Sequence, residues 1–171
     1  MSADNWKTRL DVAVNVAVLC LCVLTAVIAV KKFLLNNAPS TLSIPKNGTH
    51  LSLSGVDWGR ANRTLVMGLS TKCHFCSEST GFYQRLLKAA IASSVPVVAV
   101  FPQPTSEAQQ YWASHDIALS GVDLQQARLD SISVSGTPTL IVVDRKGLIV
   151  GAWVGKLAAA GEAEVIKQIQ H

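Results

Sequence analysis

Outside one long apolar stretch the sequence contains only two cysteines, Cys73 and Cys76, which excludes a scaffold built from several disulfides. Basic residues give a net charge of +4 but form no run longer than Lys31-Lys32, so we expect no nucleic-acid surface. Charged residues make up only 15% of the 171 residues, whereas hydrophobic residues make up 49%. This composition predicts one globular domain together with an unusually apolar segment.

The apolar segment runs from Val12 to Val30, which is 19 residues without a charge. A helix of that length spans roughly 28 Å, enough to cross the hydrocarbon core of a bilayer. It is also longer than the apolar region of a cleavable signal peptide, although a passable cleavage site keeps that alternative open. We therefore expect a short tail over residues 1–11 and a transmembrane anchor over residues 12–32, with residues 12–30 in contact with lipid. Basic residues flank the segment on both sides, so charge does not fix its orientation.

A change of composition marks the start of the globular part. Residues 33–50 are rich in Asn, Ser, Pro and Gly and predict a linker, which leaves residues 51–171 as the domain. Thr64 to Leu69 and Val95 to Phe101 are short apolar runs that predict strands buried on both faces. The spacing of apolar residues over 73–93 predicts a helix between them, and the three elements form a βαβ unit.

The second half of the domain continues this alternation. A helix is predicted from Ser106 to about His115. Thr139 to Val143 and Leu148 to Val154 flank a turn that ends in glycine, which predicts a β-hairpin, and a final helix follows over residues 158–170. The order predicts an α/β sandwich with a mixed sheet.

The chemistry is concentrated at Cys73 and Cys76, where a predicted strand turns into a helix. Unpaired N–H groups and the helix dipole favour an anion there, so Cys73 should ionise more easily than a free thiol, and its neighbours Lys72 and His74 can add to this effect. Cys76 lies three residues further on, on the same helical face, at a separation compatible with a disulfide.

This arrangement predicts a reversible dithiol/disulfide pair that needs no metal and no other cofactor. Cys73 is the expected nucleophile, which attacks the disulfide of a protein partner to give a mixed disulfide, and Cys76 is the expected resolving thiol. The same steps run backward oxidise a dithiol. The spacing does not determine which direction operates.

Other cysteine sites fit the sequence less well. Tetrahedral zinc needs four ligands, and no second cysteine pair is present in the polar part, although a copper carrier with a distant histidine stays open. Covalent haem attachment would require His where Ser77 stands. A peroxidase-type site would require Pro where Val66 stands.

The cysteine motif after a strand, together with Gly136-Thr137-Pro138-Thr139 before a hairpin, resembles the thioredoxin-like superfamily. With its N-terminal apolar segment, the chain is most similar to the TlpA/ResA-like thiol:disulfide oxidoreductases of bacterial envelopes. The resemblance covers about residues 50 to 170. It implies that Pro138 is cis and packs beside the cysteines, and that the backbone of Thr137 binds an extended substrate segment.

The sequence departs from that family at three places. Met67 stands where a buried acid is common, so proton transfer at Cys76 would need another group, such as Glu78 or water. Gly81 replaces a helix-kinking proline but can still permit a bend. His74 and Phe75 separate the two cysteines, and such intervening residues modulate the reduction potential.

The resemblance also implies a setting for the activity. We expect a single-pass protein of the inner or plasma membrane with its domain outside the cytoplasm, in the periplasm. It would act as a reductant of protein disulfides, in cytochrome c maturation or disulfide repair, and receive electrons from a membrane or soluble donor. The alternative is a copper-binding or assembly factor that uses the same two thiols as ligands.

Overall fold

The computed structural model describes residues 3–36 and 44–170 of the chain. The chain divides into two compact units, Met1–Thr41 and Leu42–His171.

The first unit is one long helix, α1 (Ala3–Asn36), which extends beyond the predicted anchor at both ends. Its described apolar side chains, such as Leu19 and Leu21, are exposed. Judged on the residues that the structure describes, no helix is both long and apolar enough to cross a membrane. The anchor over residues 12–32 therefore stays a prediction, and residues 37–43 of the predicted linker lie outside the described part of the chain.

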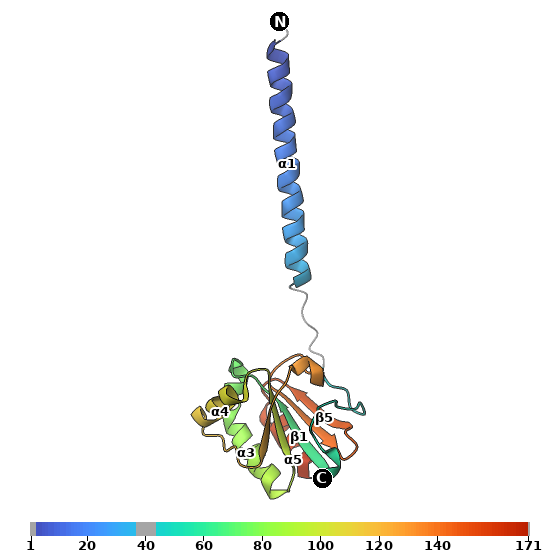
Figure 1. Ribbon diagram of the computed structural model, residues 1–171, viewed down its shortest axis with the longest axis vertical. Coiled ribbons are helices and arrows are strands. Elements are labelled where there is room, and N and C mark those ends of the chain that lie inside the picture. The colour runs from blue at the N-terminus through green and yellow to red at the C-terminus, as the bar shows by residue number, and fades with distance from the viewer. Residues whose placement is uncertain (1–2, 37–43, 171) are drawn as a thin grey trace. The chain divides into compact units, whose positions relative to one another are not determined.

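The second unit is built on a five-stranded mixed sheet in the order β3-β2-β1-β4-β5 (Figure 1). Its strands are β1 (Arg63–Gly68), β2 (Val97–Phe101), β3 (Val122–Gln126), β4 (Thr139–Asp144) and β5 (Ile149–Val154). β1 pairs in parallel with β2, and β2 with β3, whereas β4 runs antiparallel to both β1 and β5. The predicted mixed sheet is therefore confirmed, with β1 at its centre.

Within residues 44–170, four α-helices and two short 3₁₀ helices complete the domain. They are η1 (Trp58–Arg60), α2 (His74–Glu78), α3 (Thr80–Ala92), α4 (Thr105–Ser114), η2 (Leu129–Ile132) and α5 (Ala159–Gln170). The predicted β-hairpin and the helices that begin near residues 106 and 158 are confirmed to within two residues.

The helix predicted over residues 73–93 is interrupted at Ser79, and this corrects the single-helix prediction. The Ser79 hydroxyl donates a hydrogen bond to the carbonyl of Phe75 at 2.7 Å, and the Ser79 N–H donates to the carbonyl of Cys76 at 3.2 Å. Bonding of a serine side chain to the preceding turn competes with the regular backbone ladder and bends helices. The break thus comes two residues before Gly81, where a bend had been expected.

Strand β3 was not predicted. Its sequence, VDLQQ, contains only two apolar residues, and none of its side chains is fully buried. β3 lies at the edge of the sheet and pairs only with β2, with Val122 opposite Val97. An edge strand with one solvated face lacks the continuous apolar run by which the other parallel strands were identified.

The sheet separates two buried clusters. Alternate residues of β1 point to opposite faces, so Leu65 and Met67 pack with the helices, whereas Val66 packs on the other face. α3, α4 and α5 contribute to the first cluster. The second face is covered by Leu51, Ile132 and other residues from connecting segments. Burial of β1 on both faces confirms the prediction for that strand.

The last residues of the predicted linker belong to the domain's hydrogen-bonding pattern. The Gly48 N–H donates to the Ile149 carbonyl at 2.8 Å, and the Ile149 N–H donates to the Thr49 carbonyl at 2.9 Å. His50 forms a bridge with Leu148. Gly147 has a φ of +79° and lies against the His50 ring. A Cβ atom at this position would be 2.5 Å from Nε2 of His50, which is too close. Glycine at this turn therefore permits the close approach of the segment.

Candidate active site

Cys73 lies at the point where the central strand β1 has ended and helix α2 begins. It is the N-cap of α2, with an extended backbone conformation (φ −92°, ψ 113°), and its side chain caps the helix. Cys76 lies in the first turn of the same helix. The predicted placement of both cysteines at a strand-to-helix junction is therefore confirmed.

The sulfur of Cys73 has two hydrogen-bond partners. The backbone N–H of Cys76 donates to the Cys73 Sγ at 3.1 Å, and the Cys73 thiol donates to the carbonyl of Thr137 at 3.2 Å. These two contacts hold the sulfur between the start of α2 and the segment that precedes β4. Because Cys73 is only partly buried, this sulfur can be reached by a partner molecule.

Cys76 differs from Cys73 in its environment. It is fully buried, in contact with the apolar cluster between the sheet and the helices. Burial, together with a smaller contribution from the hydrogen bond with Cys73, raises the pKa of the Cys76 thiol to about 12. At neutral pH Cys76 is therefore a protonated thiol, protected from molecules that Cys73 can meet.

Thr137 and Pro138 lie beside the cysteines. The Thr137–Pro138 peptide bond is cis, as the resemblance implied, and Pro138 is buried. The carbonyl of Pro138 accepts a hydrogen bond from the N–H of Gly155 at 2.7 Å, which ties it to the end of β5. The structure thus brings Thr137 to the Cys73 sulfur, while its binding of a substrate segment stays a prediction.

The four residues predicted to modulate the cysteines are all exposed, but they differ in their contacts. Lys72 and His74 are exposed, and the Phe75 side chain is 53% exposed between the two cysteines. The carboxylate of Glu78 lies 3.0 Å from His74 Nε2 and 3.0 Å from Lys156 Nζ. All four are at or near the surface, where a docking partner would meet them.

This geometry does not favour Glu78 as the proton carrier for Cys76. The hydrogen bond from Lys156, with a smaller contribution from His74, lowers the pKa of the Glu78 carboxyl, which makes it a weak proton acceptor. Residues two positions apart on a helix also do not face each other.

Sequence reasoning missed two residues that hold the segment before Cys73. The Gln103 side chain donates from Nε2 to the Ser70 hydroxyl at 2.9 Å and accepts from the Thr71 N–H at 3.3 Å. The Glu107 carboxylate accepts a hydrogen bond from the Thr71 hydroxyl. Gln103 and Glu107 follow the carboxyl end of β2, and Cys73 follows the carboxyl end of β1. The carboxyl ends of adjacent parallel strands lie side by side, so the parallel pairing of β1 and β2 would have placed both residues near Cys73.

Replacing Gln103 by alanine removes both of its contacts to the segment that orients Cys73. A hydrogen bond of this kind contributes about 1 kcal/mol to folding, so we expect Gln103→Ala to lower the melting temperature by a few degrees. Because the segment before Cys73 is then less firmly held, we expect thiol–disulfide exchange to slow about three- to tenfold. Gln109→Ala, at an exposed position on helix α4, which begins two residues after Gln103, is the matched control. Equal rates for the two variants would show that the Gln103 contacts do not orient the site.

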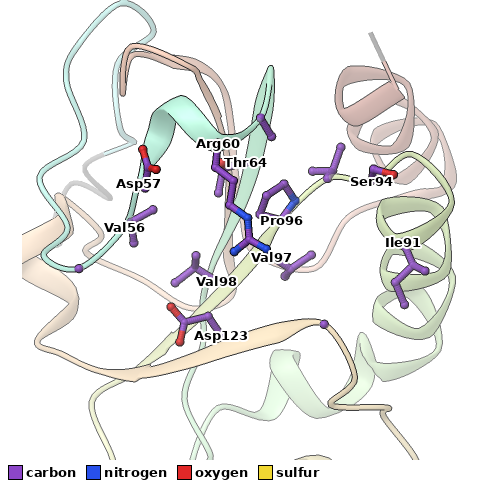
Figure 2. A pocket seen from close by; sticks show the side chains of 14 residues that line it. Val56, Asp57, Arg60, Thr64, Ile91, Ser94, Pro96, Val97, Val98 and Asp123 are labelled. Carbon is purple, nitrogen blue, oxygen red and sulfur yellow. The ribbon is translucent and has the colours of Figure 1, made fainter.

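A separate hollow of about 400 Å³ is shown in Figure 2 and is lined in part by Asp57 and Arg60. Thr64, near the start of β1, and Val97, the first residue of β2, also line it. The hollow therefore lies near the start of β1, whereas Cys73 follows the carboxyl end of this strand.

Among the described residues, no group of three or more His, Cys, Asp and Glu is arranged to hold a metal ion.

Comparison with solved structures identifies the fold. A thiol:disulfide interchange protein of the thioredoxin family from Chlorobium tepidum is 17% identical, with a TM-score of 0.56 over 74% of this chain and 98% of that chain. A thiol-disulfide isomerase from Corynebacterium glutamicum is 18% identical, with a TM-score of 0.54 over 79% and 97%. StoA from Bacillus subtilis is 16% identical, with a TM-score of 0.51 over 72% and 98%.

No protein-family model matches the sequence, and no curated protein matches it either. The structural similarity therefore establishes a thioredoxin-like fold for the globular unit. The predicted fold class is confirmed for this part of the chain.

Proposed function

We propose that this protein is a thiol:disulfide oxidoreductase that exchanges protein disulfides through Cys73 and Cys76. The observation that carries the proposal is the difference between the two cysteines. Cys73 is accessible, and its sulfur accepts a hydrogen bond from the N–H of Cys76. Cys76 is buried, and its thiol has a raised pKa. The solved structures with this fold include a thiol:disulfide interchange protein and a thiol-disulfide isomerase, which supports the same chemistry here.

In the reducing direction, the Cys73 thiolate attacks one sulfur of a substrate disulfide. A bond forms between Cys73 and that sulfur, and the other substrate sulfur leaves as a thiolate that takes a proton from solvent. Cys76 then loses its proton to solvent and attacks the Cys73 sulfur. The Cys73–Cys76 disulfide forms, the second substrate thiolate leaves, and the pair has transferred two electrons to the substrate.

The proposal includes the setting that the sequence resemblance implies. The segment over residues 12–30 would tether the domain to the inner or plasma membrane, with the domain on the extracytoplasmic side. There the protein would act as a reductant in cytochrome c maturation or disulfide repair, with electrons from a membrane or soluble donor. Retention of the full chain in the pellet after carbonate extraction of membranes tests the tether, and its release would contradict it.

The activity is tested with detergent-solubilised full-length protein in which Cys20 and Cys22 are replaced by alanine, so that only the proposed pair reacts. We expect catalytic amounts to accelerate the precipitation of insulin chains by dithiothreitol. Failure to accelerate this reaction, together with stoichiometric Cu(I) binding that requires both Cys73 and Cys76, would instead support a copper-binding factor.

A further inference from the structure

An exposed aromatic ring follows the nucleophile. Within residues 44–170 the exposed large apolar side chains are those of Ile44, Phe75 and Ile91, and Phe75 is the only aromatic residue among them. Its side chain is 53% exposed and lies two residues after Cys73, in the first turn of α2. An apolar ring in water gains free energy when a partner covers it. The ring is therefore placed where a substrate disulfide must approach.

The backbone beneath this ring is held firmly. The carbonyl of Phe75 accepts a hydrogen bond from the buried Ser79 hydroxyl at 2.7 Å. On the other side, the N–H of Cys76 donates to the Cys73 sulfur, which caps the helix. A partner that covers Phe75 thus orders little beyond one side chain, which keeps the entropic cost of docking small.

The ring of His74 lies beside that of Phe75. The two ring centroids are 5.9 Å apart. The Glu78 carboxylate holds the imidazole with one oxygen, 3.0 Å from His74 Nε2, and contacts Lys156 Nζ with the other, also at 3.0 Å. Ion pairs between exposed side chains contribute little to folding. These contacts do restrict the imidazole, so that two exposed planar rings directly follow Cys73.

The unpaired charge at this surface is positive. Lys72, directly before Cys73, is exposed and forms no ion pair with a described residue, whereas Glu78 is paired with Lys156. The Glu107 carboxylate is only partly exposed and accepts a hydrogen bond from the Thr71 hydroxyl. An acidic group on a partner would complement the free ammonium group of Lys72.

We propose that Lys72, His74 and Phe75 form a docking surface for a protein segment that carries an apolar, preferably aromatic, side chain and an acidic residue next to its disulfide. The apolar side chain covers the rings of Phe75 and His74, and the acidic residue pairs with Lys72. Docking speeds exchange because it holds the substrate disulfide near the Cys73 sulfur. This inference rests on the proposed function, since it names the class of substrate for the same two cysteines.

The test compares two peptides that are each closed by one disulfide and carry one aspartate. They differ in the residue next to one cysteine, which is phenylalanine in the first peptide and serine in the second. Reduced full-length protein with Cys20→Ala and Cys22→Ala is mixed with each peptide, and mass spectrometry after acid quenching measures how fast the reduced protein is consumed. We expect the phenylalanine peptide to react about tenfold faster, the gain from covering an aromatic ring.

Phe75→Ala should lower this ratio of rates below twofold. The ratio does not depend on the reactivity of Cys73 itself, because a change in that reactivity alters both rates equally. Ile91→Ala is the matched control, because Ile91 is an exposed apolar residue of α3 outside the docking surface. It should leave the ratio within twofold of the parent value.

The acidic part of the proposal is tested with a third peptide, in which lysine replaces the aspartate of the phenylalanine peptide. At low ionic strength it should react about threefold more slowly than the original, and Lys72→Gln should abolish the difference. Equal rates for the aspartate and lysine peptides, or a difference that persists in Lys72→Gln, would overturn this part.

Equal rates of the parent protein with the phenylalanine and serine peptides, or a tenfold ratio retained by Phe75→Ala, would overturn the docking surface as a whole. A parent protein that is consumed by none of the peptides, nor by hydroxyethyl disulfide, would instead contradict the proposed function.

Discussion

Replacing Cys73 by serine is expected to abolish thiol–disulfide exchange with protein substrates. The remaining thiol, Cys76, is fully buried and its pKa is raised to about 12, so it neither reaches a substrate disulfide nor ionises at neutral pH. The loss should exceed a hundredfold in insulin reduction, and it should leave the melting temperature nearly unchanged because Cys73 is only partly buried.

Replacing Cys76 by serine should have a different consequence. Cys73 still attacks, but no thiol resolves the product, so mixed disulfides between Cys73 and its natural partners accumulate. Non-reducing electrophoresis followed by mass spectrometry of the trapped species measures this accumulation and identifies the substrate. Equal trapping by the Cys73→Ser and Cys76→Ser variants would contradict the assigned roles.

The rate at which Cys76 closes the disulfide should rise about tenfold for each pH unit, and so about a hundredfold between pH 7 and pH 9. Only the thiolate attacks, and a pKa near 12 keeps Cys76 protonated throughout this range, so each unit of pH multiplies the thiolate fraction by about ten. The sign follows from burial, which disfavours the charged form and raises the pKa of a thiol.

Ellman's disulfide measures this rate in full-length protein with Cys20→Ala and Cys22→Ala, because it releases one coloured thiolate on reaction with Cys73 and a second when Cys76 closes the disulfide. The first release, by Cys73, is recorded in the same trace and serves as the internal control for the reagent. A second release that is independent of pH between 7 and 9 would show that Cys76 is already ionised and that its burial does not control closure.

The sequence was most informative where chemistry and local structure depend on adjacent residues. The spacing of Cys73 and Cys76 after an apolar strand predicted that a helix starts at Cys73. The residues around Pro138, read as a resemblance, predicted the cis peptide bond between Thr137 and Pro138. The β4–β5 hairpin followed from two apolar runs joined by a glycine turn.

The rest depends on contacts between distant segments. Gln103 and Glu107 reach Thr71 only because β2 and β1 are neighbours in the sheet, and neither residue belongs to a motif. Strand β3 has one solvated face and is recognisable only by its pairing with β2.

The most direct test of the central claim is an equilibrium titration of the full-length protein, with Cys20 and Cys22 replaced by alanine, in mixtures of reduced and oxidised glutathione. After rapid alkylation, peptide mass spectrometry measures the fraction of chains that carry a Cys73–Cys76 disulfide. We predict one two-electron transition, identical when approached from the reduced and from the oxidised protein. Chains in which Cys73 and Cys76 stay reduced, or carry glutathione without closing the disulfide at any ratio, would contradict the claim that these two cysteines form a reversible redox pair.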